Sequence, residues 1–201
     1  KNYLYVSGTS PVLRNHFQIY AKKMIEKFKL KKNDFILDIA SNDGTFLENF
    51  TIKKFKNVVG VDPAKNLRQL NQKKKIKINT FFFDYKKSFF LKAKYKSFKL
   101  ITANNVCAHI PDIDNFFQGV KNILKSDGDF IFEVSYLLDV INKLTFDTIY
   151  HEHMSYHSLK PLIKFAEKNG LQVFDFDLIE AQGGSIRIYV SHKNFFKIQK
   201  N

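Results

Sequence analysis

The sequence is poor in cysteine, proline and glycine and has no tryptophan: it holds one cysteine, four prolines and eight glycines in 201 residues. The single cysteine, Cys107, excludes an internal disulfide and any multi-cysteine metal site. The sequence has no run of eighteen apolar residues, and its first residues show no signal-peptide pattern. These absences predict a cytoplasmic location and no membrane partner.

The sequence also lacks repeats, low-complexity tracts and linkers rich in proline, glycine or serine. With 44% hydrophobic residues, a chain of this length can bury one substantial core. We expect an N-terminal arm and helix over residues 1–30 that pack on a single domain over residues 31–201.

Negative charge is scarce in the first half of the sequence. Residues 1–100 carry 23 Lys and Arg against 7 Asp and Glu, whereas residues 101–201 carry 10 against 12. A basic field of this kind would attract nucleic acid, an anionic membrane or a phosphorylated substrate. However, lysine accompanies phenylalanine and asparagine throughout, which indicates a compositional bias, so a nucleic-acid partner is not expected.

The elements indicated by hydrophobic periodicity alternate between helices and strands. Helices are expected at 12–29, with Ser10 as the cap and Pro11 at the first position, and at 44–50, 64–73, 112–125 and 158–168. Strands are expected at 35–39, 58–61, 77–83, 100–103, 129–134, 171–177 and 185–192, the last two pairing antiparallel. This order predicts an α/β fold with a doubly wound, mostly parallel sheet and a C-terminal antiparallel hairpin, which resembles the Rossmann-like class I methyltransferases.

The loop after the first strand, Asp38 to Gly44, is the expected cofactor segment, because ligands of open α/β sheets bind beyond the carboxyl ends of the strands. Small residues at Ala40 and Gly44 allow close approach of the backbone, and the next helix offers free N–H groups. The loop is not G-x-G-x-x-G, so the pyrophosphate fingerprint of nicotinamide enzymes is missing. We therefore expect S-adenosylmethionine as the cofactor.

Acidic residues follow the next two strands. Asp62 is placed to accept hydrogen bonds from ribose hydroxyls, and Asp84 either accepts from the adenine amino group or simply faces water. Polar residues ending the fourth strand would line the methyl-transfer site. The expected cofactor-binding residues are Asp38, Ala40, Ser41, Asn42, Gly44, Asp62, Pro63, Asp84, Asn104 and Asn105.

A second cluster, residues 146–159, holds three of the six histidines together with a glutamate and two tyrosines. A histidine can act as a general base, a carboxylate can orient it, and tyrosine hydroxyls can hold a developing oxyanion. A metal site is the alternative, since His151 and His153 flank Glu152. Because H-E-x-x-H is absent, no metal is expected.

Five segments together resemble the nucleotide-sugar C-methyltransferases, which methylate C3 of 4-keto-deoxysugars, from about Tyr3 to His192. They are Ile39-Ala-Ser-Asn-Asp-Gly-Thr45, Gly60-Val-Asp-Pro-Ala64, Ala103-Asn-Asn-Val-Cys-Ala-His-Ile-Pro-Asp112, Phe146-Asp-Thr-Ile-Tyr-His-Glu-His153 and Gly183-Gly-Ser-Ile-Arg-Ile-Tyr189. The resemblance implies that His153 removes the proton alpha to the keto group and that the enolate attacks the methyl group of the sulfonium. It also implies that the sugar site is lined by Glu152, Tyr150, His109 and a tyrosine of the N-terminal arm, assigned as Tyr5.

Some of these assignments have alternatives. His109 is read equally well as a residue of the sugar site or as part of a structural turn. Arg187 either pairs with a substrate phosphate or is a plain surface residue of an edge strand. Ala40 stands where the family usually has glycine. Family members also carry a cysteine-rich zinc domain and a further α/β domain that these residues lack, so the expected partners include such domains or a partner chain, besides the nucleotide-sugar substrate.

Two other functions fit parts of the sequence. One is a methyltransferase for another substrate, such as RNA or a small molecule. Enzymes that methylate amino groups of nucleic acids carry Asp/Asn-Pro-Pro-Tyr/Phe after the fourth strand, where this chain has Asn104-Asn-Val-Cys107. The other is a non-catalytic partner module that binds S-adenosylmethionine, a reading favoured by the missing domains and opposed by the intact Tyr150 to His153 segment.

Overall fold

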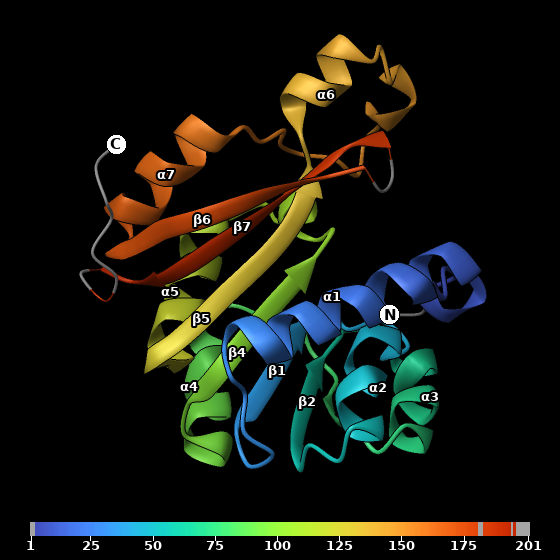
Figure 1. Cartoon of the computed structure of the whole chain (residues 1–201), viewed down its shortest axis with the longest axis vertical. Coiled ribbons are helices and arrows are strands. Elements are labelled where there is room, and N and C mark those ends of the chain that lie inside the picture. The colour runs from blue at the N-terminus through green and yellow to red at the C-terminus, as the bar shows by residue number, and fades with distance from the viewer. Residues whose placement is uncertain (1–2, 181–182, 194, 196–201) are drawn as a thin grey trace.

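A seven-stranded sheet organises the computed structural model, which describes residues 3–180, 183–193 and 195 (Figure 1). Its strand order is β3-β2-β1-β4-β5-β7-β6; neighbours from β3 to β5 run parallel, and β7 is antiparallel to both β5 and β6. The strands are β1 Phe35–Ile39, β2 Asn57–Val61, β3 Lys77–Asn79, β4 Phe98–Asn104, β5 Leu124–Ser135, β6 Leu171–Ile179 and β7 Ser185–His192. The predicted fold class, including the antiparallel hairpin, is confirmed.

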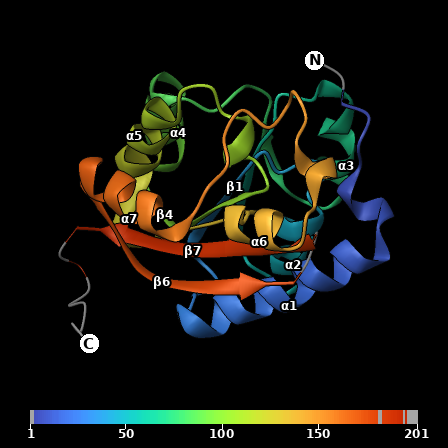
Figure 2. The same cartoon turned by 90° about the horizontal axis from the view of Figure 1, so that it is seen from above.

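Helices cover both faces of the sheet (Figure 2). They are α1 Pro11–Lys27, α2 Thr45–Ile52, α3 Arg68–Lys73, α4 Tyr85–Tyr95, α5 Ile113–Ile123, α6 Leu137–Asn142 and α7 Leu159–Lys168, with short 3₁₀ turns at Ser7–Thr9, Lys65–Leu67, Cys107–His109 and Phe146–Thr148. Phe17 of α1 and Phe46 of α2 belong to the core on one face, whereas Phe117 of α5 and Leu162 of α7 belong to the core on the other. Burial on both faces explains why the central parallel strands β1, β2 and β4 consist mostly of apolar residues.

Helix α1 begins as predicted, because the Ser10 side chain accepts a hydrogen bond from the Leu13 amide and Pro11 occupies the first turn. The helix packs against α2 and the sheet through Phe17, Tyr20 and Met24. Its polar side also contacts the sheet, since His16 lies 2.8 Å from Glu133 of β5. The arm that precedes α1 is thereby placed above the ends of the strands.

The predicted strand 77–83 is too long, and the helix after it was not predicted. Strand β3 ends at Asn79 because the following phenylalanines pack on helices: Phe81 contacts Phe90 of α4, and Phe83 contacts Phe116 of α5. Helix α4 is rich in lysine and buries only three side chains, so its apolar periodicity is weak. Helix α6, which has only six residues and buries only Val140, was also missed.

Within the described part of the chain, no helix combines the length and hydrophobicity that crossing a bilayer requires.

Candidate functional site

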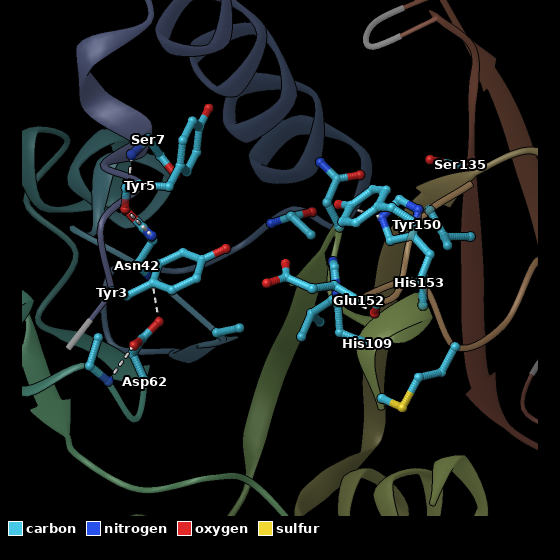
Figure 3. A pocket seen from close by; sticks show the side chains of 18 of the residues that line it. Tyr3, Tyr5, Ser7, Asn42, Asp62, His109, Ser135, Tyr150, Glu152 and His153 are labelled. Carbon is cyan, nitrogen blue, oxygen red and sulfur yellow. Dashed lines mark hydrogen bonds between the residues drawn. The ribbon is translucent and has the colours of Figure 1, made fainter. Parts of the chain in front are cut away.

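A pocket of about 870 Å³ opens at the carboxyl ends of β1, β2, β4 and β5. Two groups of side chains face each other across it (Figure 3): Tyr3 and Asp62 on one side, and Glu152 and His153 on the other. The pocket thus joins the loop expected to hold the cofactor to the segment expected to hold the base. The predicted site residues that line it are Tyr5, Ala40, Asn42, Asp62, Pro63, Asn104, Asn105, His109, Tyr150, Glu152 and His153.

The β1–α2 loop has an unusual backbone. Ala40, Asn42 and Gly44 all have left-handed conformations, with φ of 59°, 50° and 79°. A Cβ atom at Gly44 would lie 2.7 Å from Oδ1 of Asn71, so glycine is required there for its φ and for space. These turns bring the chain from β1 directly into α2, whose N-terminus therefore points at the end of the strand.

Asp62 is held at the end of β2 by two main-chain amides. Its Oδ2 accepts from the Asn42 N–H at 2.8 Å, and its Oδ1 accepts from the Ala64 N–H at 2.8 Å. Burial raises the pKa of this carboxyl, and the two amide bonds oppose the rise. Each carboxylate oxygen keeps a further lone pair, so Asp62 can also accept hydrogen bonds from a ligand in the pocket.

Asp38 lies behind the pocket wall, and its Oδ1 accepts from Thr102 Oγ1 at 2.7 Å and from Asn104 Nδ2 at 3.2 Å. Burial raises the pKa of Asp38 to about 8. Two polar atoms at this end of the sheet, Ser41 Oγ and Asn104 Oδ1, are buried without a hydrogen-bond partner among the described residues. An unpaired buried acceptor is costly, and Asn104 lines the pocket, so a ligand donor there would be favourable.

The raised pKa of Asp38 predicts how stability depends on pH. The unfolded chain ionises Asp38 near pH 4 while the folded chain keeps the proton up to about pH 8. Stability therefore falls as pH rises through this window, by at most about 1.4 kcal/mol per pH unit from this group. Asp38→Asn cannot ionise, so its stability advantage over the wild type is expected to grow from pH 5 to pH 8 in urea unfolding of the ligand-free chain. Parallel pH curves for the two proteins would contradict this. Asp34→Asn serves as the control; this half-buried side chain precedes β1, and its Oδ2 accepts from the Lys31 N–H at 2.7 Å.

His153 is oriented as a base would need to be. Its Nδ1 lies 2.8 Å from the Thr148 carbonyl, which can only accept, so Nδ1 carries the proton and Nε2 has the free lone pair. The Tyr150 hydroxyl, 3.1 Å away, donates to that Nε2. The Thr148 carbonyl thus sets the tautomer of His153. The basic Nε2 lies beside the Tyr150 hydroxyl, which can also donate to a ligand oxygen.

His109 is held in the same way. Its Nδ1 donates to the Glu152 carbonyl at 2.8 Å, and its ring centre lies 4.8 Å from that of His153. Burial lowers the pKa of His109, with a further contribution from His153. His109 therefore does more than complete a 3₁₀ turn: it supports the loop that carries Glu152, and it lines the pocket as a neutral imidazole near pH 7.

The charge around the pocket is negative. Asp62, Asp147 and Glu152 line it, and the described lining residues include no lysine or arginine. The +14 net charge of the chain is therefore carried elsewhere. A pocket of this kind favours a cationic ligand and disfavours a phosphate group inside it.

Five of the predicted site residues do not line the pocket, and two of them, Asp84 and Arg187, are used elsewhere in the fold. Asp84 caps α4 instead, where its Oδ1 accepts from the Lys87 N–H at 2.5 Å, because the chain has already left the sheet at Asn79. Arg187 is not on an edge strand, since β7 lies between β5 and β6. Its guanidinium is buried against the Tyr20 ring and pairs with Glu133, so it is unavailable to a substrate phosphate.

The remaining predicted residues, Asp38, Ser41 and Gly44, shape the loop from behind the pocket. The sequence reasoning missed Tyr3, which lines the pocket as Tyr5 does. The sequence carried no signal that distinguishes the two, because both are tyrosines of the same short arm. No group of three or more His, Cys, Asp or Glu residues suited to a metal occurs in the described part of the chain.

Comparisons with known proteins agree with this geometry. Residues 13–175 match the model of a family described as a methyltransferase domain. The C-methyltransferase NovU of Streptomyces niveus is 32% identical over 190 residues, which are 94% of this chain and 45% of that protein. The chain thus spans about half the length of this curated relative.

Solved structures share the fold at low sequence identity. The PH0226 protein of Pyrococcus horikoshii matches with a TM-score of 0.72 at 16% identity, covering 94% of this chain and 95% of that one. The magnesium protoporphyrin IX methyltransferase of Synechocystis, solved with bound SAH, matches with a TM-score of 0.65 at 10% identity, covering 89% and 83%. Because the family model covers most of the chain, the protein belongs to the methyltransferase domain family.

Proposed function

We propose that this chain binds S-adenosylmethionine and methylates a carbon atom next to a ketone, in an acceptor of the nucleotide-linked 4-keto-deoxysugar class. The observation that carries the proposal is the unprotonated Nε2 of His153, which lies in the same pocket as Asp62. Methylation of an oxygen or nitrogen that is already nucleophilic needs little beyond positioning, whereas methylation of carbon needs a base. The name of the 32% identical relative, a C-methyltransferase, supports the same reading.

The donor side of the pocket fits a cationic nucleoside. Asp62 would accept from ribose hydroxyls, the unpaired Asn104 Oδ1 would accept from the ammonium group, and the α2 N-terminus would face the carboxylate. The acidic lining suits a sulfonium better than the pyrophosphate of a nicotinamide dinucleotide. When bound, S-adenosylmethionine supplies an electrophilic methyl group.

The acceptor side would generate the nucleophile. His153 Nε2 takes the proton from the carbon alpha to the ketone. The electron pair of that C–H bond becomes the C=C bond of the enolate, and the π electron pair of the carbonyl moves onto its oxygen. Tyr150 then donates to the developing oxyanion instead of to Nε2. The enolate carbon would then bond to the methyl group that bound S-adenosylmethionine supplies, and the electron pair of the broken C–S bond would leave with the sulfur.

The rest of the acceptor would lie outside this pocket. With no lysine or arginine among the described lining residues, a diphosphate would gain nothing there. We therefore propose that only the sugar enters and that the nucleotide extends beyond the rim. Arg187 is therefore no longer proposed to pair with a substrate phosphate.

The proposal is tested in D₂O with a 4-keto-deoxysugar nucleotide and the chain, with SAH in place of the donor. Deuterium is expected to enter at the carbon alpha to the ketone faster than without protein, because the base acts before methyl transfer. Calorimetry should show SAH binding, and Asp62→Asn should weaken it. Binding of SAH without exchange in any such sugar would overturn carbon methylation, while absence of SAH binding would overturn the donor assignment.

A further inference from the structure

The N-terminal arm, residues 3–9, lies over the donor side of the pocket, and its main chain is held by two asparagine side chains (Figure 3). One is Asn66, in the 3₁₀ turn Lys65–Leu67 that follows Asp62. The other is Asn42, in the β1–α2 loop. Both side chains therefore connect the arm to segments that surround the end of β2.

Asn66 pairs with Tyr3 through both main-chain groups of that residue. The Tyr3 N–H donates to Asn66 Oδ1 at 3.0 Å, and Asn66 Nδ2 donates to the Tyr3 carbonyl at 2.9 Å. A carboxamide that satisfies the amide and the carbonyl of one residue fixes the direction of its backbone, and with it the direction of the side chain. No other hydrogen bond is recorded for the Tyr3 main chain within the described residues.

Asn42 holds the next part of the arm while contacting the donor site. Its Nδ2 donates to the Tyr5 carbonyl at 3.0 Å, and its Oδ1 accepts from the Ser7 N–H at 2.9 Å. The main-chain N–H of the same residue donates to Asp62. Asn42 therefore links the position of the arm to the conformation of the β1–α2 loop, which is called the donor loop from here on.

The arm in this position brings Tyr3 toward the acceptor side. In Figure 3 the Tyr3 hydroxyl points across the pocket toward Glu152, whereas the ring of Tyr5, which also lines the pocket, does not point toward Glu152. Burial raises the pKa of Tyr3, and the carboxylate of Glu152 raises it further, which agrees with this orientation. Tyr3, and not Tyr5, is thus the arm tyrosine that faces Glu152.

We propose that Asn66 is a positioning residue that aims the Tyr3 hydroxyl at the acceptor, and that Asn42 ties this arrangement to the donor loop. The inference rests on the proposed function and extends it. Tyr3 faces the acceptor only while the arm is held by Asn66 and Asn42, and Asn42 can hold the arm only when the β1–α2 loop is ordered. Donor binding is then expected to favour acceptor binding.

A double-mutant cycle tests the role of Asn66. Asn66→Ala and Tyr3→Phe are each expected to reduce exchange at the acceptor carbon by about 10-fold to 100-fold, since misplacing a contacting group by about 1 Å can cost 100-fold. The double variant should be no worse than the poorer single variant, because Asn66 acts through Tyr3. Additive losses, or an unchanged rate in Asn66→Ala, would overturn the proposal. Asn115→Ala is the matched control: its Oδ1 accepts from the Tyr85 N–H at 2.7 Å, away from this pocket.

A second measurement needs no acceptor and so separates this inference from the proposed function. Amide hydrogen exchange of the arm is followed with and without SAH, in wild type and in Asn66→Ala. Protection at Tyr3 and Ser7 is expected to rise with SAH in the wild type and to be lost at Tyr3 in the variant. Protection that does not respond to SAH or to the substitution would overturn the link between arm and donor loop, whatever the acceptor proves to be.

Discussion

Replacing His153 with alanine is expected to reduce both deuterium exchange and methyl transfer by about 10²-fold to 10⁴-fold, the range for loss of a general base. The substitution removes the one acceptor that the Tyr150 hydroxyl has among the described residues, and it leaves Asp62 and Asn104 in place. The affinity for SAH, measured by calorimetry, should therefore stay within about twofold, because no donor contact proposed here involves His153.

Two comparisons make this prediction decisive. His192→Gln changes a histidine that bonds to the Leu124 carbonyl, outside the lining of the pocket, and should keep wild-type rates. Tyr150→Phe should slow transfer less than His153→Ala, because the base remains. If His153→Ala retains full exchange, the base lies elsewhere, and His109, with its ring centre 4.8 Å from that of His153, becomes the next residue to test.

Replacing Glu133 with alanine is expected to destabilise the fold by about 3 kcal/mol, the lower end of the range for breaking a buried ion pair. Glu133 is 2% exposed; its Oε1 accepts from Arg187 Nε at 2.6 Å, and its Oε2 lies 2.8 Å from His16 Nε2. Its loss leaves the guanidinium of Arg187 buried, with Asp177 at 3.6 Å as partial compensation. Urea unfolding at pH 7 measures the change.

Surface pairs provide the control. Asp114→Ala removes the partner of Lys168, an exposed pair at 3.0 Å, and should cost far less stability than Glu133→Ala, because solvent screens the pair. In the double variant Glu133→Met/Arg187→Met, much of the lost stability should return, since apolar side chains of similar size can replace a buried pair. Equal losses for Glu133→Ala and Asp114→Ala would show that burial of Arg187 is not the cause.

This buried pair also connects the core to the site. His16 belongs to α1, and its contact with Glu133 joins the helix to β5 beside the pocket. The arm that carries Tyr3 leads directly into α1. Asn66 and Asn42 therefore hold the arm at its start, and the contact of His16 with Glu133 holds the helix that follows it.

Local chemistry was sufficient to predict most of the elements. Ser10 and Pro11 marked the start of α1 because a capping side chain and a fixed φ act within one turn. The span of β1 was identified correctly, since a strand buried on both faces of a parallel sheet is mostly apolar, and Asp38 is the one charged residue in it. Helix α4 was missed because it is rich in lysine and buries few side chains, so its sequence shows little apolar periodicity.

The sequence by itself determined the fold class and the chemical character of the site. The loop from Asp38 to Gly44, the acid Asp62 and the Tyr150 to His153 segment are local features, and their residue types already restrict the chemistry. What only the tertiary structure decided was which side chains meet. The packing of Phe81 and Phe83 on helices turned Asp84 into a cap, and the insertion of β7 between β5 and β6 buried Arg187. The choice between Tyr3 and Tyr5 likewise depended on Asn66, which is 63 residues away along the chain and reaches the arm only through the fold.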